Sequence, residues 1–444
     1  MAAADASEKL ALIRENLAEI LNPEIIEKIL DEGRHPKIYW GMFWLVLVLA
    51  LPCLFTIALE RLETGDERWK TRDERWETGG SMCVCIANNG TFCFFSLGTA
   101  TTGRPHCGYF VPAIKIAQYL AAGCHVTILL ADIHGFLDNL KAPIELVELR
   151  VEFYRFVISA IFKAVGVSTE KLKFVQGSSY QKSPEYIMDV YKLSSVISEH
   201  DAKRAGAEVV KQTDNAPLSG LLYPILQVLD EQYLDVDAQF GGLDQRKLFI
   251  AAKDWLPKLG YKERCHLMNP MVPGLKGAKM SSSDEDSKID LLDAPDVVAK
   301  KIRKAVATPK VVEENGILAF VEYVLLPVAA LKGKREFVVD RERDGLEPLV
   351  YSSISQMHED YRNDVLSPQI LKAAVTKSLN ELLAPIQAEF QASKEWQEIA
   401  IKAYPPPAKK EKKVKDKGSR HPGNAKAKEG QIDVKDLKDA VNEV

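Results

Sequence analysis

The stretch that decides the fold is the apolar run His125-Val126-Thr127-Ile128-Leu129-Leu130-Ala131. Its β-branched and leucine side chains are typical of a strand that is buried on both faces of a parallel sheet. The amphipathic segment Ala113–Ala122 directly precedes this run and predicts a crossover helix. Further outward, Lys37–Gly41 predicts an earlier strand, so strand, helix and strand form a βαβ unit.

Two shorter runs, Lys173–Val175 and Val236–Phe240, predict further strands of the same sheet. The predicted fold class is therefore α/β, with a Rossmann-type parallel sheet that binds ligands at the carboxyl ends of its strands. Before the sheet begins, Ser7 and the apolar residues that recur up to Leu21 predict one amphipathic helix.

Composition divides the chain into three parts. Residues 1–288 hold the predicted sheet, and residues 289–407 are predicted to form an α-helical domain with clear apolar runs at Ile317–Leu331 and Ile370–Phe390. Residues 408–444 form a Lys-rich tail that is too polar to bury a core and is predicted to be disordered. Such a tail serves either to solubilise the protein or to bind phosphates regardless of sequence, with an affinity that falls steeply with salt.

The bulk composition is that of an ordinary soluble globular protein: 444 residues, 46% hydrophobic, 27% charged, net charge −4. It does not by itself indicate a nucleic-acid binder. The seven cysteines have no regular spacing and give no disulfide framework, and Cys83-Val84-Cys85 supports a metal site too weakly to assign one. The N-terminus fits neither a secretory signal nor a transit peptide, so a reducing, cytoplasmic location is expected.

The segment Met42–Gly98 differs in composition from everything around it. Its first part, Met42–Leu59, is uncharged, apolar and just long enough to span a bilayer. A single span would leave the two flanks on opposite sides, whereas these flanks read as one continuous strand-to-helix unit. The only possible return span, Met82–Leu97, is interrupted by Asn88-Asn89-Gly90 and makes a poor membrane helix. We therefore expect no membrane association.

Two other interpretations of Met42–Gly98 remain. A long inserted loop is one, although structureless loops of this size are uncommon in compact domains. The other, which we favour, is intron sequence retained in the coding sequence. The codons for Cys93-Phe94-Phe95-Ser96-Leu97 are compatible with a pyrimidine-rich splice acceptor, and those for Gly41-Met42 with a splice donor. A transcript lacking these codons would settle the matter, and a peptide from Asp66–Gly80 in purified protein would exclude it.

Two motifs carry chemistry. Once Met42–Gly98 is removed, Lys37–Gly41 runs into Thr99–His106, giving a strand, a Gly/Thr-rich turn and a helix from about Tyr109. Small residues at such a turn let backbone N–H groups approach a phosphate at a helix N-terminus. Much later, Lys279-Met280-Ser281-Ser282-Ser283 follows a glycine-containing loop, and a lysine with adjacent hydroxyls can neutralise a triphosphate. Either motif alone also has an ordinary structural explanation.

The pairing of an H-x-G-x turn with a late K-M-S-S-S loop resembles the signature of class I aminoacyl-tRNA synthetases. The rest of the chain, Leu10–Gly41 and Thr99–Tyr404, looks like the eukaryotic and archaeal tyrosyl-tRNA synthetases. The matching stretches are Lys37–Gly41 with Thr99–His106, Ala131–His134, Gly206–Gln212, Tyr223-Pro224, Asp237–Arg246 and Met268–Gly274.

This resemblance implies a reaction and a set of partners. Tyrosine attacks the α-phosphate of ATP, which Mg²⁺ accompanies, to give tyrosyl-adenylate and pyrophosphate. The tyrosyl group then passes to the 3′-terminal ribose of tRNA(Tyr). The resemblance also implies that residues 289–407 bind the anticodon and that the enzyme is a homodimer, joined through Gly206–Gln212 and the preceding helix.

The resemblance further assigns roles to the phosphate motifs. Thr102 and His106 would stabilise the γ-phosphate in the transition state, and Lys279, Ser281 and Ser282 would hold the pyrophosphate. The positions expected to contact ATP are Gly41, Gly103, His106, Gly108, Gly242, Asp244, Lys279 and Met280. No covalent nucleophile is required, because catalysis would consist of positioning and charge stabilisation.

The tyrosine pocket implied by the resemblance has five residues. Tyr39 and Asp230 would bond the substrate phenol, Tyr223 and Gln227 its α-amino group, and Gln245 would lie near the carboxyl and the α-phosphate. Tyr223, Gln227 and Asp230 recur at i, i+4 and i+7, on one face of a helix. A site that bonds a hydroxyl rejects phenylalanine, a selectivity for which tyrosyl-tRNA synthetases are themselves the standard example.

The resemblance is weakest beyond the sheet. Lys334–Tyr351 contains no tryptophan, whereas relatives place an anticodon-stacking tryptophan there, so no anticodon contact is assigned. The nearest alternative is a tryptophanyl-tRNA synthetase, against which the Tyr39 and Asp230 pair argues. A catalytically inactive paralogue that acts as a binding module is the other alternative, and only Met42–Gly98 favours it.

Overall fold

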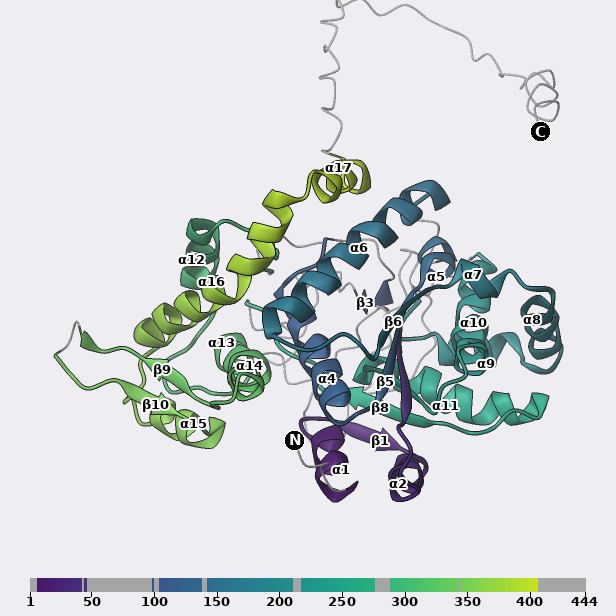
Figure 1. Cartoon of the computed structure of the whole chain (residues 1–444), viewed down its shortest axis with the longest axis horizontal. Coiled ribbons are helices and arrows are strands. Elements are labelled where there is room, and N and C mark those ends of the chain that lie inside the picture. The colour runs from purple at the N-terminus through teal and green to yellow at the C-terminus, as the bar shows by residue number, and fades with distance from the viewer. Residues whose placement is uncertain are drawn as a thin grey trace, which may run out of the picture. The chain divides into compact units, whose positions relative to one another are not determined.

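A six-stranded sheet organises the part of the chain that holds the predicted strands (Figure 1). The computed structural model describes residues 6–41, 44–45, 98–99, 104–137, 142–210, 217–275, 288–342 and 345–405. The strand order is β1 (Glu19–Leu21), β8 (Cys265–Asn269), β7 (Ala238–Gly242), β2 (Lys37–Gly41), β5 (His125–Leu130) and β6 (Leu172–Gln176). All neighbours pair in parallel except β1, which is antiparallel to β8.

The sheet confirms the four predicted strands, and the sequence missed two others. The omission of β8 follows from its mixed composition, Cys-His-Leu-Met-Asn, although all five residues are buried. The predicted helix from Ser7 to Leu21 is wrong in its second half. Helix α1 (Ala6–Arg14) is followed by Asn16 at φ 58°, a left-handed conformation that stops a helix, and the chain then pairs with β8 as β1.

Helices cover both faces of the sheet, because alternate side chains of each strand point to opposite sides. Ile38 and Trp40 of β2 belong to one apolar core, and Tyr39 between them belongs to the other. The first core is shared with α4 (Phe110–Ala121) and α6 (Ile144–Val165). The second is shared with α8 (Pro184–Val196), α10 (Ser219–Tyr233) and α11 (Arg246–Trp255). The remaining helices of this region are α2 (Pro23–Asp31), α5 (Asp132–Leu137), α7 (Ser178–Gln181) and α9 (Glu199–Ala205).

The direction of strand order reverses beside β2. The chain proceeds from β2 to β5 and β6 on one side, and then returns to β7 and β8 on the other. At such a switch point the connections at the carboxyl ends diverge and leave a crevice in which α/β proteins bind ligands. The carboxyl ends of β2, β5 and β7 therefore define where a site is expected.

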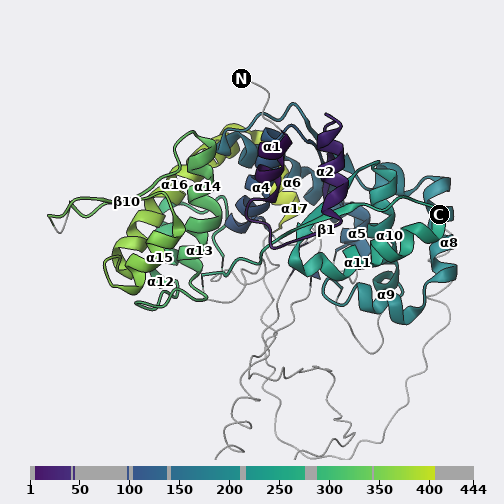
Figure 2. The ribbon, with the colours of Figure 1, turned by 90° about the horizontal axis from the view of Figure 1, so that it is seen from below.

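The region after Lys288 is mostly helical but also contains a hairpin (Figures 1 and 2). Its helices are α12 (Pro295–Lys304), α13 (Gly316–Phe320), a π-helix (Val321–Leu325), α14 (Leu326–Leu331), α15 (Ile354–Arg362), α16 (Pro368–Ala392) and α17 (Lys394–Ala403). The hairpin pairs β9 (Phe337–Val339) with β10 (Leu349–Tyr351), two short strands that the sequence reading did not include.

Residues Met1–Pro405 form one compact unit that joins this region to the sheet region. The stack of Trp396 on Phe156, with ring centroids 5.6 Å apart, packs α17 against α6. The predicted boundary at residue 288 therefore lies within one unit, and the predicted tail, residues 408–444, lies outside the described residues.

The ends of the segment Met42–Gly98 lie side by side. Strand β3 (Trp44–Leu45) pairs antiparallel with β4 (Gly98–Thr99), so Trp44 stands opposite Thr99. The chain thus leaves the end of β2 and returns beside the point at which it left. This is the geometry expected if Met42–Gly98 interrupts a single strand-to-helix unit. The predicted apolar run Met42–Leu59 lies almost wholly outside the described residues. Among the helices that are described, none has the length and apolar character to cross a membrane.

Candidate active site

A cluster of buried polar side chains, which we call the tyrosine pocket, lies beside β2 and consists of Tyr39 and one face of α10. Helix α10 spans Ser219–Tyr233 and so places Tyr223, Gln227 and Asp230 on successive turns. All four side chains are at most 1% exposed. The Tyr39 hydroxyl lies 3.5 Å from the carbonyl oxygen of Gln227, a long and weak hydrogen bond. The structure thus brings together four of the five residues predicted for the tyrosine pocket.

Gln245 joins the same group from the other side of the crevice. It ends the 3₁₀ turn Leu243–Gln245 that follows β7, and its Oε1 accepts a 3.0 Å hydrogen bond from Nε2 of Gln227. Its own Nε2 donates to Oδ2 of Asp244 at 3.2 Å. Gln227 Oε1 is buried and has no hydrogen-bond partner among the described residues. A buried acceptor of this kind suits a ligand that donates, such as an ammonium group.

Asp230 is held by three donors that sequence reasoning missed. Its Oδ1 accepts from the Tyr180 hydroxyl at 2.7 Å and from Gln181 Nε2 at 2.8 Å, and it shares the proton of the Tyr186 hydroxyl, 3.0 Å away, with the carbonyl oxygen of Leu226 at 2.9 Å. Tyr180 and Gln181 lie on the short helix α7, which begins just after the carboxyl end of β6. Their position just after a predicted strand could have identified them as site residues, because the carboxyl ends of neighbouring parallel strands share one edge of the sheet.

The other carboxyl oxygen of Asp230 is directed elsewhere. Oδ2 is buried, has no hydrogen-bond partner among the described residues, and lies 3.7 Å from Nε2 of His134. The His134 ring packs edge-on against Tyr223, with ring centroids 4.8 Å apart. Burial lowers the pKa of His134 to about 3, so the imidazole is neutral at physiological pH. Oδ2 therefore remains an acceptor available to a ligand hydroxyl.

Burial also raises the pKa of Asp230 to about 7, even though the three donors oppose the shift. Glu231, the next residue on α10, adds to the rise. Desolvation raises the pKa of the Tyr39 phenol as well, so Tyr39 keeps its proton and can donate. The pocket thus holds a fixed donor and an acceptor that titrates near neutrality.

The nucleotide side of the crevice follows β7. A Cβ on Gly242 would lie 2.2 Å from Oδ1 of Asp244, so a side chain at position 242 would displace that carboxylate. The glycine leaves the carboxylate at the mouth of the crevice, where a ribose hydroxyl could donate to it. Gly242 and Asp244 are therefore adjacent to Gln245, as their predicted roles require.

His106 lies at the start of the helical segment that leads into α4. Its Nδ1 accepts the backbone N–H of Gly108 at 3.1 Å and so caps the 3₁₀ turn Cys107–Tyr109. The neutral ring therefore carries its proton on Nε2 and can donate from there. Gly41 ends β2. Of the other predicted phosphate contacts, Thr102, Gly103, Lys279, Met280, Ser281 and Ser282 lie outside the described residues.

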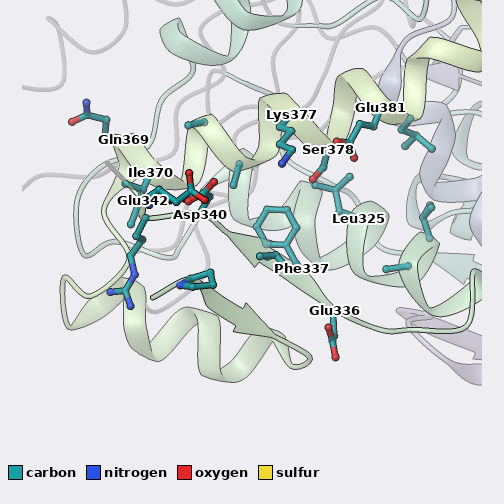
Figure 3. A pocket seen from close by; sticks show the side chains of 18 of the residues that line it. Leu325, Glu336, Phe337, Asp340, Glu342, Gln369, Ile370, Lys377, Ser378 and Glu381 are labelled. Carbon is teal, nitrogen blue, oxygen red and sulfur yellow. Dashed lines mark hydrogen bonds between the residues drawn. The ribbon is translucent and has the colours of Figure 1, made fainter. Parts of the chain in front are cut away.

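A second hollow lies in the region after Lys288. It has a volume of about 940 Å³ and is bounded by α14, the β9–β10 hairpin and α16 (Figure 3). Phe337 and Ile370 form part of an apolar floor, and charged groups, among them Arg341 and Lys377, surround it. Many of the residues that line this groove are exposed, whereas the polar residues beside Tyr39 are buried. Elsewhere in the described chain, no group of three or more His, Cys, Asp or Glu side chains could hold a metal ion.

The fold and the site define a class of protein. Residues 89–384 match the family model described as tRNA synthetases class I (W and Y), and this chain belongs to that family. The matched residues include β5, β6, β7 and β8 of the sheet and most of the helical region that follows it, and they begin after β1 and β2.

Several single proteins are similar to this chain over most of its length. The chain is 47% identical over 437 residues to the cytoplasmic tyrosine–tRNA ligase of Saccharomyces cerevisiae, with 96% of each chain covered. It is also 47% identical to the zebrafish (Danio rerio) cytoplasmic tyrosine–tRNA ligase, and covers 65% of that longer protein. Its fold matches the tyrosyl-tRNA synthetase of Archaeoglobus fulgidus, solved with L-tyrosine, with a TM-score of 0.68, 30% identity, and coverage of 86% of this chain and 99% of that one.

Proposed function

We propose that this chain is a tyrosine–tRNA ligase. It activates L-tyrosine with ATP to tyrosyl-adenylate and pyrophosphate, and then transfers tyrosine to the 3′-terminal ribose of tRNA(Tyr). The observation that carries the proposal is the buried pair at the base of the pocket: a Tyr39 donor and the unpartnered Asp230 Oδ2 acceptor. Its relatives of 47% identity are named as ligases of this specificity.

The pocket chemistry explains the choice of amino acid. A substrate phenol donates to Oδ2 of Asp230 and accepts from Tyr39, which gives both buried groups a partner. Phenylalanine leaves Asp230 Oδ2 without a hydrogen-bond partner among the described residues and leaves Tyr39 with only its 3.5 Å bond to the Gln227 carbonyl, at a cost of about 1–3 kcal/mol for the buried carboxylate oxygen. The substrate ammonium donates to Gln227 Oε1 and approaches the Tyr223 hydroxyl.

The reaction then needs charge stabilisation on the nucleotide side. Gly242 and Asp244 hold the adenylate ribose, and Gln245 lies near the tyrosine carboxyl and the α-phosphate. The Nε2–H of His106 donates to the departing phosphates together with Thr102, and Lys279, Ser281 and Ser282 hold the pyrophosphate. Gly41, Gly103, Gly108 and Met280 allow the nucleotide to approach the backbone. Mg²⁺ enters with ATP as part of the substrate.

Recognition of tRNA falls to the region after Lys288. The groove between α14, the hairpin and α16 has an apolar floor that suits an unstacked base, and Lys332, Arg341 and Lys377 could meet a phosphate, although the groove is also lined by Glu336, Asp340, Glu342 and Glu381. This composition supports anticodon binding by residues 289–407. The Lys-rich tail, residues 408–444, adds sequence-independent attraction for phosphates.

The active form is a homodimer. Helix α8, which precedes the predicted interface Gly206–Gln212 in the chain, exposes three large apolar side chains, Ile187, Met188 and Tyr191. Exposed apolar groups at helical spacing indicate a partner surface, and a second copy of this chain is the partner we assign. Sedimentation should show a Met188→Glu chain as a monomer and the unsubstituted chain as a dimer. Equal masses would exclude this surface.

The place of action is the cytoplasm, the compartment in the names of the curated relatives. There the working enzyme lacks Met42–Gly98, which we interpret as retained intron sequence. Mass spectrometry of the native protein should find no peptide from Asp66–Gly80. Detection of such a peptide would contradict this interpretation and leave the ligase assignment untouched.

The test of the proposed function is an amino-acid panel in ATP–pyrophosphate exchange, run on the chain with and without residues 42–98. We expect tyrosine alone to support exchange, and the shorter chain to be the more active. Exchange with tryptophan in place of tyrosine would overturn the assignment. Absence of exchange with every amino acid in both forms would favour an inactive paralogue.

A further inference from the structure

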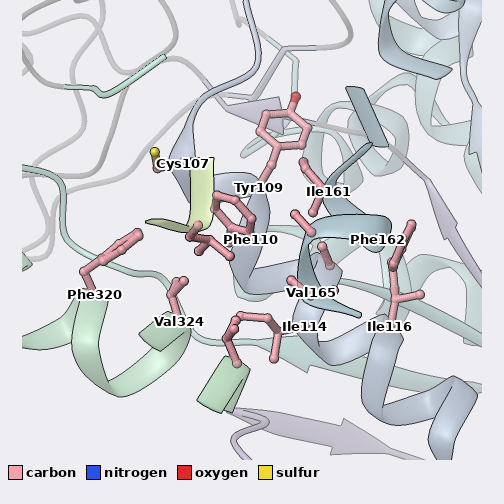
Figure 4. Close-up of a cluster of buried hydrophobic side chains, with 14 of the residues drawn as sticks. Cys107, Tyr109, Phe110, Ile114, Ile116, Ile161, Phe162, Val165, Phe320 and Val324 are labelled. Carbon is pink, nitrogen blue, oxygen red and sulfur yellow. The ribbon is translucent and has the colours of Figure 1, made fainter. Parts of the chain in front are cut away.

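One small apolar junction joins the two phosphate-binding motifs to the C-terminal helices. It contains Cys107, which follows His106, and Leu275 and Ile289, which stand on either side of the segment that carries Lys279. All three are buried and line a cavity of about 10 Å³. The other lining residues are Ile302 of α12, Gly316, Ile317 and Phe320 of α13, and Val375 and Leu379 of α16. Figure 4 shows Cys107 and Phe320 in the same cluster of buried side chains.

The chain that enters the lysine motif is fixed by the C-terminal helices. The carbonyl of Leu275 accepts a 2.7 Å hydrogen bond from the backbone N–H of Val306, just beyond α12. A Cβ on Gly316, the first residue of α13, would lie 2.2 Å from the carbonyl oxygen of Gly274. Backbone meets backbone at this point, so any side chain at position 316 would displace one of the two segments.

The chain that leaves the motif is fixed at both ends of the next turn. The carbonyl of Ile289 accepts a 2.9 Å hydrogen bond from the N–H of Cys107, and Asp290 forms a β-bridge with His106. A few residues on, the carbonyl of Asp293 accepts from Gln387 Nε2 of α16 at 2.8 Å. Helix α16 thus contacts the exit turn directly and reaches the cavity through Leu379.

We propose that this junction fixes the two flanks of the segment that carries Lys279, at Leu275 and Ile289, relative to the His106 turn, and that Gly316 and Leu379 are positioning residues for the ATP half of the reaction. The inference rests on the proposed function. Neither residue touches substrate. Both act through the backbone on either side of the motif, because a close-packed apolar junction transmits small displacements. The tyrosine pocket belongs to the other apolar core and is not affected.

A matched pair on α16 tests the proposal in the full chain. Leu379 and Leu383 are both buried and stand one turn apart, but only Leu379 lines the junction. Alanine at either position removes the same atoms and creates a cavity. We expect Leu379→Ala to lower the kcat of tyrosine-dependent pyrophosphate exchange roughly 10- to 100-fold with the KM for tyrosine unchanged. Leu383→Ala should retain the parental kcat. Equal kcat values in the two variants would overturn the proposal.

Amide hydrogen exchange gives a readout that does not need activity. The N–H groups of Cys107 and Val306 should exchange faster in Leu379→Ala and Gly316→Ala than in the parent, and at the parental rate in Leu383→Ala. Unchanged protection in the first two variants would refute the junction even if the enzyme is inactive. If the unsubstituted chain supports no ATP–pyrophosphate exchange with any amino acid, that result would instead count against the proposed function.

Discussion

The pocket beside Tyr39 and the groove beside α16 solve recognition in opposite ways. The pocket residues Tyr39, Tyr223, Gln227 and Asp230 are all nearly or completely buried, and each polar atom has a fixed neighbour or a single ligand to meet. The groove has a volume of about 940 Å³, with side chains of both charges around an apolar floor. The comparison teaches that, under the proposed function, buried polar atoms would select the small amino acid, whereas shape and charge would select an RNA loop.

The difference appears in the energetics. A buried acceptor such as Asp230 costs folding free energy until its ligand arrives, and so it discriminates strongly. Charges at the open rim, such as Lys377, are screened by water and each contributes little. Substitutions in the pocket should therefore have larger and more specific effects than substitutions in the groove.

Among the substitutions that keep Asp230 ionisable, the strongest effect is expected from removing the hydrogen bonds that hold its carboxylate. In a Tyr180→Phe, Tyr186→Phe double variant, Oδ1 loses two of its three donors. We expect kcat/KM for tyrosine to fall roughly 100-fold, about 1.4 kcal/mol for each lost bond. Those donors lower the pKa of Asp230, so the acid limb of the pH profile of kcat/KM should move to higher pH. A loss of activity without that shift would mean a merely structural role.

The charge on Asp230 should also be visible as a stability cost. Its pKa is raised from 3.8 to about 7, so the stability of the folded state falls as pH rises between these two values, is lowest above pH 7, and carries no penalty below pH 3.8. Asp230→Asn keeps an oxygen for the three donors and removes the charge. The variant should be more stable than the parent, with an advantage that grows by about 2–3 kcal/mol between pH 5 and pH 8. Urea unfolding at the two pH values measures it, and a constant difference would contradict the account.

Groove substitutions should act on tRNA alone. Lys377→Ala is expected to raise the KM for tRNA roughly tenfold and to lower its salt dependence, while tyrosine-dependent exchange stays at the parental rate. Lys300→Ala, an exposed lysine of the same region outside the groove, is the matched control. If both variants charge tRNA equally well, the groove does not bind it.

The smallest effect is expected from the tail. Deletion of residues 408–444 should raise the KM for tRNA roughly two- to fivefold at low salt and flatten its salt dependence, since each phosphate contact contributes to the slope. The exchange rate should not change. Indifference of the KM at every salt concentration would leave the tail with a solubilising role.

The sequence predicted those strands and helix faces whose apolar or polar residues recur at regular spacing. Strands β2, β5, β6 and β7 and the face of α10 were visible because buried strands and helix faces repeat in a regular way. It missed β1 because that strand exists only through its pairing with β8, which no local pattern encodes. It missed Tyr180, Gln181 and Tyr186 because they lie 44 to 50 residues before Asp230 in the chain and meet it only in the folded structure. The hairpin of β9 and β10 was hidden by strands only three residues long.

The central claim is that Asp230 selects the substrate phenol. It is tested most directly by tyrosine-dependent ATP–pyrophosphate exchange in Asp230→Ala beside the unsubstituted chain, with both also measured on phenylalanine. We predict that the substitution abolishes tyrosine-dependent exchange and the preference for tyrosine over phenylalanine. Unchanged tyrosine-dependent exchange in Asp230→Ala would contradict the account.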